Sequence, residues 1–294
     1  MEVAPTAAVA VTSVRAADFA ELTKPRITML VLVTAAVGYV VGGAGAFDAV
    51  GFLAFLAGTG LLCAGASALN QYLEREADGR MVRTRRRPIP AGRVAPAEAL
   101  VFGLALSAAG LLALAAVNPL TLALGAFSSL SYLLAYTPLK RVTPLCTIVG
   151  AVPGALPPLM GWAAARGSLG PAGWALFAVL FLWQLPHFLA IGWLYRDDYA
   201  RGGFPMLAVR DPEGASTGRQ MVLCTTALLP VTLAAGALAS AGRGYLWGAL
   251  ALGAAFLAFT LLFARSRSTD AARRVFLASV LYLPVLLGLM VFDR

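Results

Sequence analysis

Three oxygen-bearing side chains, Asn70, Glu74 and Asp78, follow an apolar stretch at residues 50–69 and are spaced four residues apart. On an α-helix, residues four apart share one face, and each lies about 6 Å further along the axis than the last. Mg²⁺ prefers such oxygen ligands and fills its remaining positions with water and phosphate oxygens, and Mn²⁺ accepts the same set. The spacing therefore predicts a divalent cation site that works on a phosphorylated substrate. A solvated helix end with ordinary interfacial charges is the alternative.

Four arginines come directly after this acidic face, within the five residues 83–87. A need for positive charge on one side of a membrane explains a few of them. It does not explain their concentration beside a candidate metal site, where planar guanidinium groups bind diphosphate oxygens in bidentate fashion. The segment is therefore predicted to contribute to the same site.

Two later apolar stretches, at 119–136 and 172–194, also end in charged residues. Tyr136 ends the first, with Lys140 and Arg141 just after it, and the three fit either a diphosphate site or a membrane-interface anchor. Asp198 follows the second, where it is either a further acid of the site or the partner of a neighbouring arginine. Both segments are expected at the same membrane face as the first acidic cluster.

His187 is the single histidine of the chain and lies just after Pro186 in a hydrophobic stretch. A hydrogen-bonded packing role is one interpretation of a histidine in such a place. The chain cannot supply two histidine ligands to a haem iron. It can offer one to a haem that arrives as substrate.

The composition indicates which elements must position these residues: 60% are hydrophobic, 13% are charged, and the mean hydropathy is +0.79. A membrane-spanning helix needs about 20 mostly apolar residues. Because the apolar runs carry glycine, alanine and proline freely and do not alternate, they predict packed helices rather than barrel strands. The predicted fold is an all-α polytopic membrane bundle of about nine helices, near 27–43, 50–69, 97–117, 119–136, 145–163, 172–194, 220–240, 244–264 and 275–292.

The basic residues predict how this bundle is oriented. Of the 23 Lys and Arg, only Arg166, Arg243 and Arg294 lie outside the amino-terminal segment and the loops that follow the even-numbered spans. The positive-inside rule then places the amino terminus and the active site at the cytoplasmic face of the inner membrane, with the carboxyl terminus outside. The net charge of +9 reflects this topology and attraction to anionic lipid, so no nucleic-acid partner is expected. Residues 1–20 are predicted to be disordered, and 21–294 to form a single domain.

Several strings, taken in order along the chain, resemble the protohaem IX farnesyltransferases (haem O synthases), a family of the intramembrane aromatic prenyltransferase superfamily. They lie at residues 22–26, 70–88, 136–141, 154–162, 183–188 and 198–199. The resemblance implies transfer of a farnesyl group from farnesyl diphosphate to a vinyl group of haem B, giving haem O, through departure of diphosphate and an allylic cation. It also implies a Mg²⁺ requirement, haem B as substrate, and a haem A synthase as a candidate partner.

The resemblance also assigns roles residue by residue. It implies metal binding and catalysis by Asn70, Glu74 and Asp78, with Asp198 at a second metal or diphosphate contact and Lys140 as a catalytic cation. It implies haem contact by His187 and Trp183. Diphosphate or propionate binding is implied for a further group of polar side chains: Lys24, Arg26, Arg83, Arg87, Tyr136 and Arg141.

Two positions depart from the pattern of the family. Glu74 stands where relatives usually have aspartate, so the metal is expected about one methylene further from the helix or held in a different order. Leu194 stands four residues before Asp198, where related enzymes carry a second acid. Two other functions stay open. A prenyltransferase for a quinone precursor or a chlorin would use the same diphosphate site, whereas a transporter of anionic metabolites should place polar residues near the bilayer midplane.

Overall fold

The computed structural model describes residues 16–43 and 47–293, and this part of the chain is helical with no β-strand. It contains nine helical segments long and apolar enough to cross a membrane, which confirms the predicted number. They are α2 (Pro25–Gly42), α3 (Ala49–Arg80), α4 (Pro96–Val117), the continuous run α5 (Pro119–Leu130), η1 (a π-helix, Ser131–Tyr136) and α6 (Thr137–Leu139), then α7 (Cys146–Arg166), α8 (Pro171–Leu194), α11 (Ala215–Leu238), α12 (Arg243–Ser266) and α13 (Thr269–Phe292).

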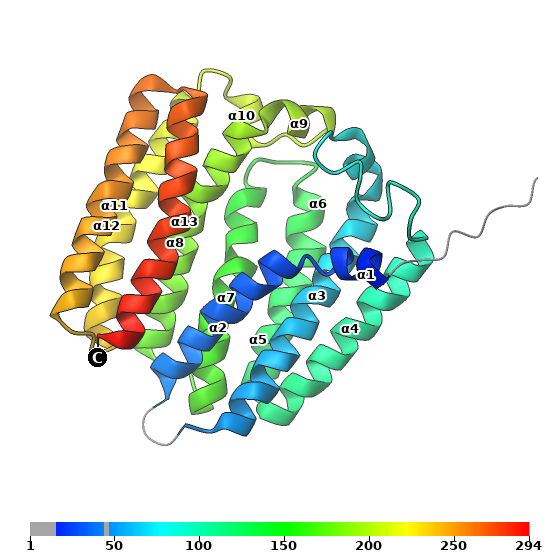
Figure 1. Cartoon of the computed structure of the whole chain (residues 1–294). Coiled ribbons are helices and arrows are strands. Elements are labelled where there is room, and N and C mark those ends of the chain that lie inside the picture. Colours follow the sequence, from blue (N-terminus) through cyan, green and yellow to red (C-terminus); the bar gives the residue numbers. More distant parts are fainter. Residues whose placement is uncertain (1–15, 44–46, 294) are drawn as a thin grey trace, which may run out of the picture.

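Three short helices complete the described chain: α1 (Ala16–Leu22), α9 (Arg196–Arg201) and α10 (Leu207–Arg210). Figure 1 shows α9 and α10 at one end of the bundle, beside the irregular segment 81–95, and this end is called the loop end below. Because α1 is helical, the expected disordered segment does not extend to residue 20. Residues 1–15 of that predicted segment lie outside the described residues.

Local sequence sets where the spanning helices begin. The side chains of Asp48, Asn118 and Ser268 accept hydrogen bonds from the first free backbone amides of α3, α5 and α13. Proline occupies the start of a helix where its missing N–H costs nothing, at Pro25, Pro96, Pro119 and Pro171.

Close contact between helices depends on small residues. An added Cβ on Gly38 of α2 would collide with the backbone of Pro158 in α7, and one on Gly161 with the carbonyl of Ala35. Gly110 of α4 is packed in the same way against the backbone of α3. Such approach is how helices associate in lipid, where burial of apolar surface gives little driving force.

Helix α3 positions the acidic cluster. Its 32 residues make it about 48 Å long at 1.5 Å per residue, which exceeds a hydrocarbon layer of about 30 Å. It therefore continues past the predicted apolar span at 50–69 without a break, and its last turns reach the loop end (Figure 1).

Candidate active site

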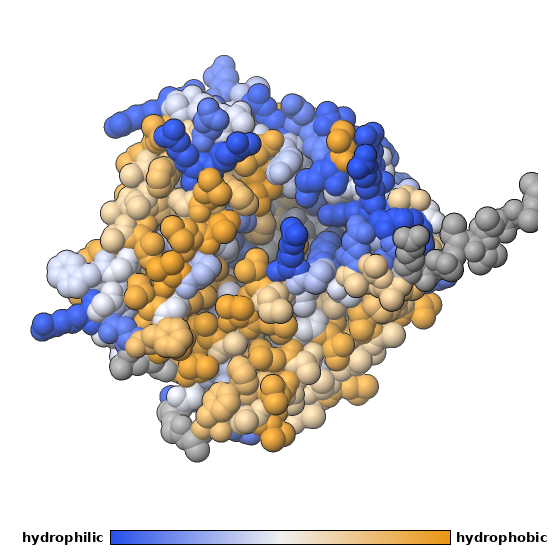
Figure 2. Space-filling view, viewed as in Figure 1, coloured by the Kyte–Doolittle hydropathy of each residue, from blue (hydrophilic) through white to orange (hydrophobic). Residues whose placement is uncertain are grey.

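A cavity of about 400 Å³ lies in the bundle, lined by side chains from α2, α3, α5, η1, α7 and α8. Its lining divides into a polar part at the loop end and an apolar part further inside. Figure 2 shows the surface hollowed beside α2, with hydrophilic residues gathered toward the loop end and hydrophobic residues over the spans. The apolar part is lined by Ile27, Val31, Leu62, Met160, Phe188 and Ile191.

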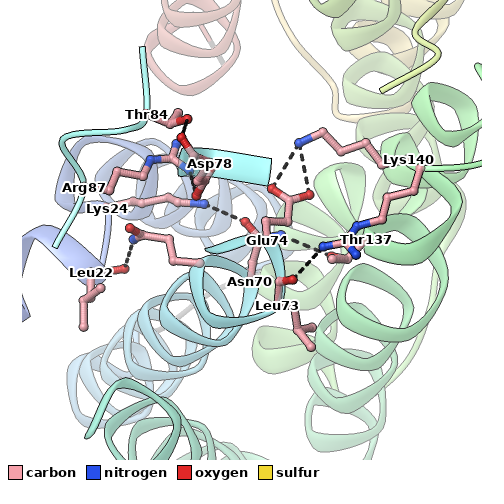
Figure 3. Close-up of polar contacts among 12 residues, drawn as sticks. Leu22, Lys24, Asn70, Leu73, Glu74, Asp78, Thr84, Arg87, Thr137 and Lys140 are labelled. Atoms are coloured by element: carbon pink, nitrogen blue, oxygen red, sulfur yellow. Dashed lines mark hydrogen bonds and ion pairs between the residues drawn. The ribbon is translucent and has the colours of Figure 1, made fainter. Parts of the chain in front are cut away.

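One face of α3 supplies the acidic side of the cavity, as the four-residue spacing predicted. Asn70, Glu74 and Asp78 are 3%, 2% and 0% exposed and all line the cavity. The amide of Asn70 accepts a hydrogen bond from Lys24 Nζ at 2.9 Å and donates one to Thr137 Oγ1 at 3.2 Å (Figure 3). Its carbonyl oxygen therefore points toward the ammonium group of Lys24, the residue just before α2.

The two carboxylates are each paired with a cation from another segment. Lys140 Nζ lies 3.1 Å from both oxygens of Glu74, and Arg87 Nη1 lies 2.6 Å from Asp78 Oδ2 (Figure 3). The other oxygen of Asp78, Oδ1, is enclosed and has no hydrogen-bond partner among the described residues. An unpaired carboxylate oxygen inside a protein is costly, and such a group commonly marks a place for a ligand or an ion.

Lys24 is held toward the cavity by an unusual backbone. Its φ of 49° is in the left-handed region, which a non-glycine residue rarely adopts, directly before Pro25 begins α2. Burial and the neighbouring Arg87 lower the pKa of Lys24 to about 8. A cation with a lowered pKa lacks enough negative charge around it, and a bound anion would supply that charge.

Lys140 is more strongly compensated. Burial opposes its ammonium, but the carboxylate of Glu74 and the neighbouring Tyr199 and Tyr132 together outweigh this effect and raise the pKa of Lys140. Its Nζ also lies 4.4 Å from the centre of the Phe204 ring, a favourable position for a cation. Lys140 therefore stays charged and fixes Glu74 in place.

Asp198 connects two segments of the loop end. Its Oδ1 accepts hydrogen bonds from the backbone N–H of Val82 and from Arg201, and its Oδ2 accepts one from the backbone N–H of Arg83. Burial works against the ionised form, but these hydrogen bonds lower the pKa of Asp198. The guanidinium of Arg83 lies 5.8 Å from the Tyr199 ring and lines the cavity. Asp198 thus holds the backbone that carries Arg83.

The charges around the cavity favour an anion. Its lining contains two carboxylates, Glu74 and Asp78, and four cations, namely Lys24, Arg83, Arg87 and Lys140. This excess of positive charge, at the mouth of an apolar chamber, suits a molecule with an anionic head and a hydrocarbon tail.

The donor set also fits a magnesium-type cation bound together with phosphate oxygens. No three His, Cys, Asp or Glu side chains in the described part of the chain lie close enough to hold a metal by themselves. The oxygens that face the cavity belong to Asn70 and Glu74, which also accept hydrogen bonds from Lys24 and Lys140, and to Asp78, whose Oδ1 has no partner among the described residues. Mg²⁺ characteristically takes one or two carboxylates and obtains its other ligands from water and substrate.

Some of the predicted site residues lie outside the cavity lining. They are Arg26, Arg141, Trp183, His187 and Asp198. Arg26 is exposed, and Arg141 donates instead to the carbonyl of Leu73. A metal contact at Asp198 stays a prediction, and its two oxygens already accept three hydrogen bonds.

Other residues at the site were not predicted. Tyr132 lines the cavity and stacks on Tyr136, with ring centres 5.4 Å apart. Both belong to the π-helix η1, and such wide turns are frequent at functional sites. The four-residue spacing of the two tyrosines in the sequence could have predicted that Tyr132 shares a helix face with Tyr136. Thr137 accepts a hydrogen bond from Asn70, and Thr84 donates one to the backbone carbonyl of Asp78. No pattern in the sequence indicated either contact.

Sequence comparisons give one consistent family. The profile of the UbiA prenyltransferase family matches residues 31–283. The chain is 49% identical over 287 residues to the protoheme IX farnesyltransferase of Solibacter usitatus (strain Ellin6076), with 94% of this chain and 98% of that protein covered. It is 45% identical over 289 residues to the protein of the same name from Koribacter versatilis (strain Ellin345), with 94% and 93% covered.

Solved structures with the same fold share little sequence. A digeranylgeranylglyceryl phosphate synthase superposes with a TM-score of 0.80 at 16% identity, over 94% of this chain and 97% of that one. A UbiA homolog from Archaeoglobus fulgidus, bound to GPP and Mg²⁺, superposes with a TM-score of 0.64 at 15% identity, over 93% and 99%. At this level of identity the likeness concerns the fold.

Proposed function

Because the chain belongs to the UbiA prenyltransferase family, we propose that it transfers a farnesyl group from farnesyl diphosphate to a vinyl group of haem B and so forms haem O. The names of the Solibacter and Koribacter relatives support this acceptor. The observation that carries the proposal is the cavity itself, in which an excess of cations surrounds the entrance to an apolar chamber. A prenyl diphosphate has the matching distribution of charge.

The cations of the entrance bind the diphosphate. Arg83 and Arg87 present planar guanidinium groups, and Lys24 presents an ammonium that a bound anion stabilises in its charged form. The farnesyl chain then lies along the apolar lining contributed by α2, α3 and α7. This places the bond that breaks at the border between the polar and apolar parts.

The residues that would hold Mg²⁺ or Mn²⁺ are Asn70, Glu74 and Asp78. When bound there, the metal supplies positive charge that stabilises diphosphate as a leaving group. The protein contributes by keeping Asn70 and Glu74 oriented through Lys24, Thr137 and Lys140. Oxygens held in place before the reaction need no reorganisation as charge develops.

The atoms of the reaction balance with water as the one further reagent. The bond between the farnesyl carbon and the diphosphate oxygen breaks, and its electron pair leaves with diphosphate. The vinyl electron pair forms the new carbon–carbon bond, water adds at the resulting cationic carbon, and a proton is released. An apolar chamber keeps bulk water from the allylic cation until the vinyl group reacts.

The setting of the reaction follows from the distribution of basic residues. The chain lies in the inner membrane with its amino terminus and the loop end at the cytoplasmic face and its carboxyl terminus outside. Residues 21–294 act as one prenyltransferase domain. The product stays in the bilayer, where a haem A synthase is its candidate recipient.

A mass-resolved pigment assay tests this function. Purified protein receives haem B, farnesyl diphosphate and Mg²⁺, with and without a chelator, and extracted haems are identified by mass. A chelator-sensitive haem O peak is expected. Prenylation of a quinone precursor in a parallel reaction, with no haem O, would overturn the acceptor and keep the diphosphate site. Failure with both acceptors would favour an anion transporter.

A further inference from the structure

His187 is a functional group that the cavity does not use. It lies on α8, faces α13 and is half-buried, and it is not part of the cavity lining. Figure 1 shows α8 and α13 side by side. The next residue, Phe188, does line the cavity. His187 therefore lies at the edge of the chamber, between the face of α8 that lines the cavity and the face that packs against α13.

The hydrogen bonds of Ser279 determine which ring nitrogen of His187 carries the proton. Ser279 Oγ lies 2.6 Å from the backbone carbonyl of Phe276 and 2.7 Å from His187 Nδ1. A carbonyl only accepts, so the single hydroxyl hydrogen of Ser279 is donated to Phe276. The hydroxyl oxygen must then accept from His187, which makes Nδ1 the protonated nitrogen. Nε2 keeps its lone pair.

Nε2 is free to bind a ligand. No residue in the described part of the chain forms a hydrogen bond with it, and it is not among the enclosed polar atoms that lack a partner. A histidine that donates from one nitrogen to a fixed acceptor and offers the other to a metal is the usual arrangement at metal sites. A histidine used only for packing would more often have both nitrogens satisfied or enclosed.

The surroundings of His187 suit a flat aromatic ligand. The rings of Trp183, Phe188 and Phe276 have their centres 5.1, 5.4 and 5.2 Å from the imidazole. Trp183 also donates from Nε1 to the backbone carbonyl of Ser279 at 2.8 Å, so two side chains of α8 are held on one residue of α13. The imidazole is fixed against rotation within an aromatic wall.

We propose that His187 Nε2 is an axial ligand of the haem iron of the substrate, with Ser279 as the positioning residue that sets its tautomer. This inference rests on the proposed function, because it assigns a site to the haem acceptor. The haem lies against α8 and α13 at the edge of the chamber, and Phe188 separates it from the apolar lining that holds the farnesyl chain. A vinyl group directed past Phe188 meets that chain.

Optical and electron paramagnetic resonance spectra of haem B bound to the purified protein test the ligation directly. The wild-type protein is expected to give a histidine-ligated spectrum, which His187→Gly loses. Imidazole added to the His187→Gly protein should restore it, because a free imidazole fits the space of the missing side chain. A spectrum of His187→Gly identical to that of the wild type would overturn the proposal.

Ser279 variants test the positioning role. Ser279→Ala should weaken haem B binding about tenfold, as loss of a hydrogen bond to a metal-binding histidine typically does, whereas Ser279→Thr should retain binding. Thr225→Val, which deletes a buried hydroxyl between α11 and α12, is the matched control and should bind haem normally. Equal haem binding by all three variants would exclude the role of Ser279.

The two proposals fail in different ways. If the wild-type protein makes haem O and His187→Gly keeps the wild-type haem spectrum, the proposed ligation is wrong and the proposed reaction stands. If the protein binds haem through histidine but makes no haem O from farnesyl diphosphate, the proposed reaction is wrong and the proposed haem site stands.

Discussion

The two halves of the bundle differ in how they use buried polar side chains. In the half built from α11, α12 and α13, the buried polar side chains are neutral, and most of them pair within this half. Thr225 and Thr260 are hydrogen-bonded at 2.9 Å, and Thr232 bonds Tyr282 at 2.8 Å while its carbonyl accepts from Tyr245 at 2.8 Å. Such pairs join neighbouring helices.

In the half that contains α2, α3 and α6, the buried polar groups include charged side chains, and these are incompletely satisfied. Glu74 and Asp78 face more cations than they can neutralise, and one oxygen of Asp78 has no partner in the described chain. Buried charge of this kind weakens a membrane bundle unless a ligand completes it. The comparison teaches that satisfied neutral pairs indicate packing, whereas an excess of charge indicates a binding site.

The largest effect that would test this comparison is expected at Asp78. Asp78→Asn keeps the side-chain shape but removes the negative charge from the unpaired oxygen, so kcat/KM for farnesyl diphosphate should fall by about a hundredfold or more, with a weaker response to Mg²⁺. Steady-state assays across a Mg²⁺ titration measure both. Asp211→Asn alters a carboxylate outside the cavity that bonds Thr217, and it should remain active. An active Asp78→Asn enzyme would show that the metal site is wrongly placed.

The second effect separates charge from packing at Lys140. Lys140→Met leaves Glu74 buried without its partner, so the free energy of unfolding should fall by about 3 kcal/mol and turnover should be lost. The double variant Lys140→Met with Glu74→Gln removes both charges and should recover most of the stability without recovering turnover. Thermal unfolding in detergent and the pigment assay measure the two quantities. Recovery of turnover in the double variant would mean that the pair is only structural.

A smaller effect is expected at Asp198, which acts on the site through Arg83. Asp198→Ala releases the backbone of Val82 and Arg83, so KM for farnesyl diphosphate should rise about tenfold while the Mg²⁺ dependence stays unchanged. Asp197→Ala is a matched neighbour whose side chain is 84% exposed, and it should behave as wild type. A changed Mg²⁺ dependence in Asp198→Ala would instead support direct metal binding by this residue.

The smallest effect is expected in the neutral half. Tyr282→Phe removes one hydroxyl from the pair with Thr232, whose own hydroxyl still donates to the carbonyl of Leu228. The free energy of unfolding should fall by about 1 kcal/mol with turnover unchanged. The same change at Tyr136, in the cavity lining, should reduce kcat/KM a few-fold. Similar losses of turnover in the two variants would contradict the proposed difference between a packing half and a binding half.

Much of the fold was predictable because it depends on properties that are local along the chain. Nine apolar stretches become nine spans in the described residues, and the four-residue spacing of Asn70, Glu74 and Asp78 becomes one face of α3. The length of α3 was harder to predict, because hydropathy decreases after Leu69 while the helix continues to Arg80. Propensity and periodicity indicate a helix, but the limit of an apolar run is not the limit of the helix.

The assignment of partners required the tertiary structure. Lys140 meets Glu74 across 66 positions of sequence, Lys24 meets Asn70 across 46, and Asp198 reaches the backbone of Arg83 across 115. Nothing local distinguishes Lys140 from Arg141, yet one enters the cavity and the other binds a backbone carbonyl of α3. Likewise, the lone histidine was visible in the sequence, but its tautomer depends on Ser279, 92 positions away.

Residue type and spacing therefore decide which segments are helices, which of them cross the membrane, and where chemistry is possible, because these properties arise within a few turns of one helix. Helix packing decides which charges are paired, which oxygen is left free and which nitrogen faces outward. Those outcomes depend on contacts between residues far apart in the chain, and such contacts exist only once the bundle has formed.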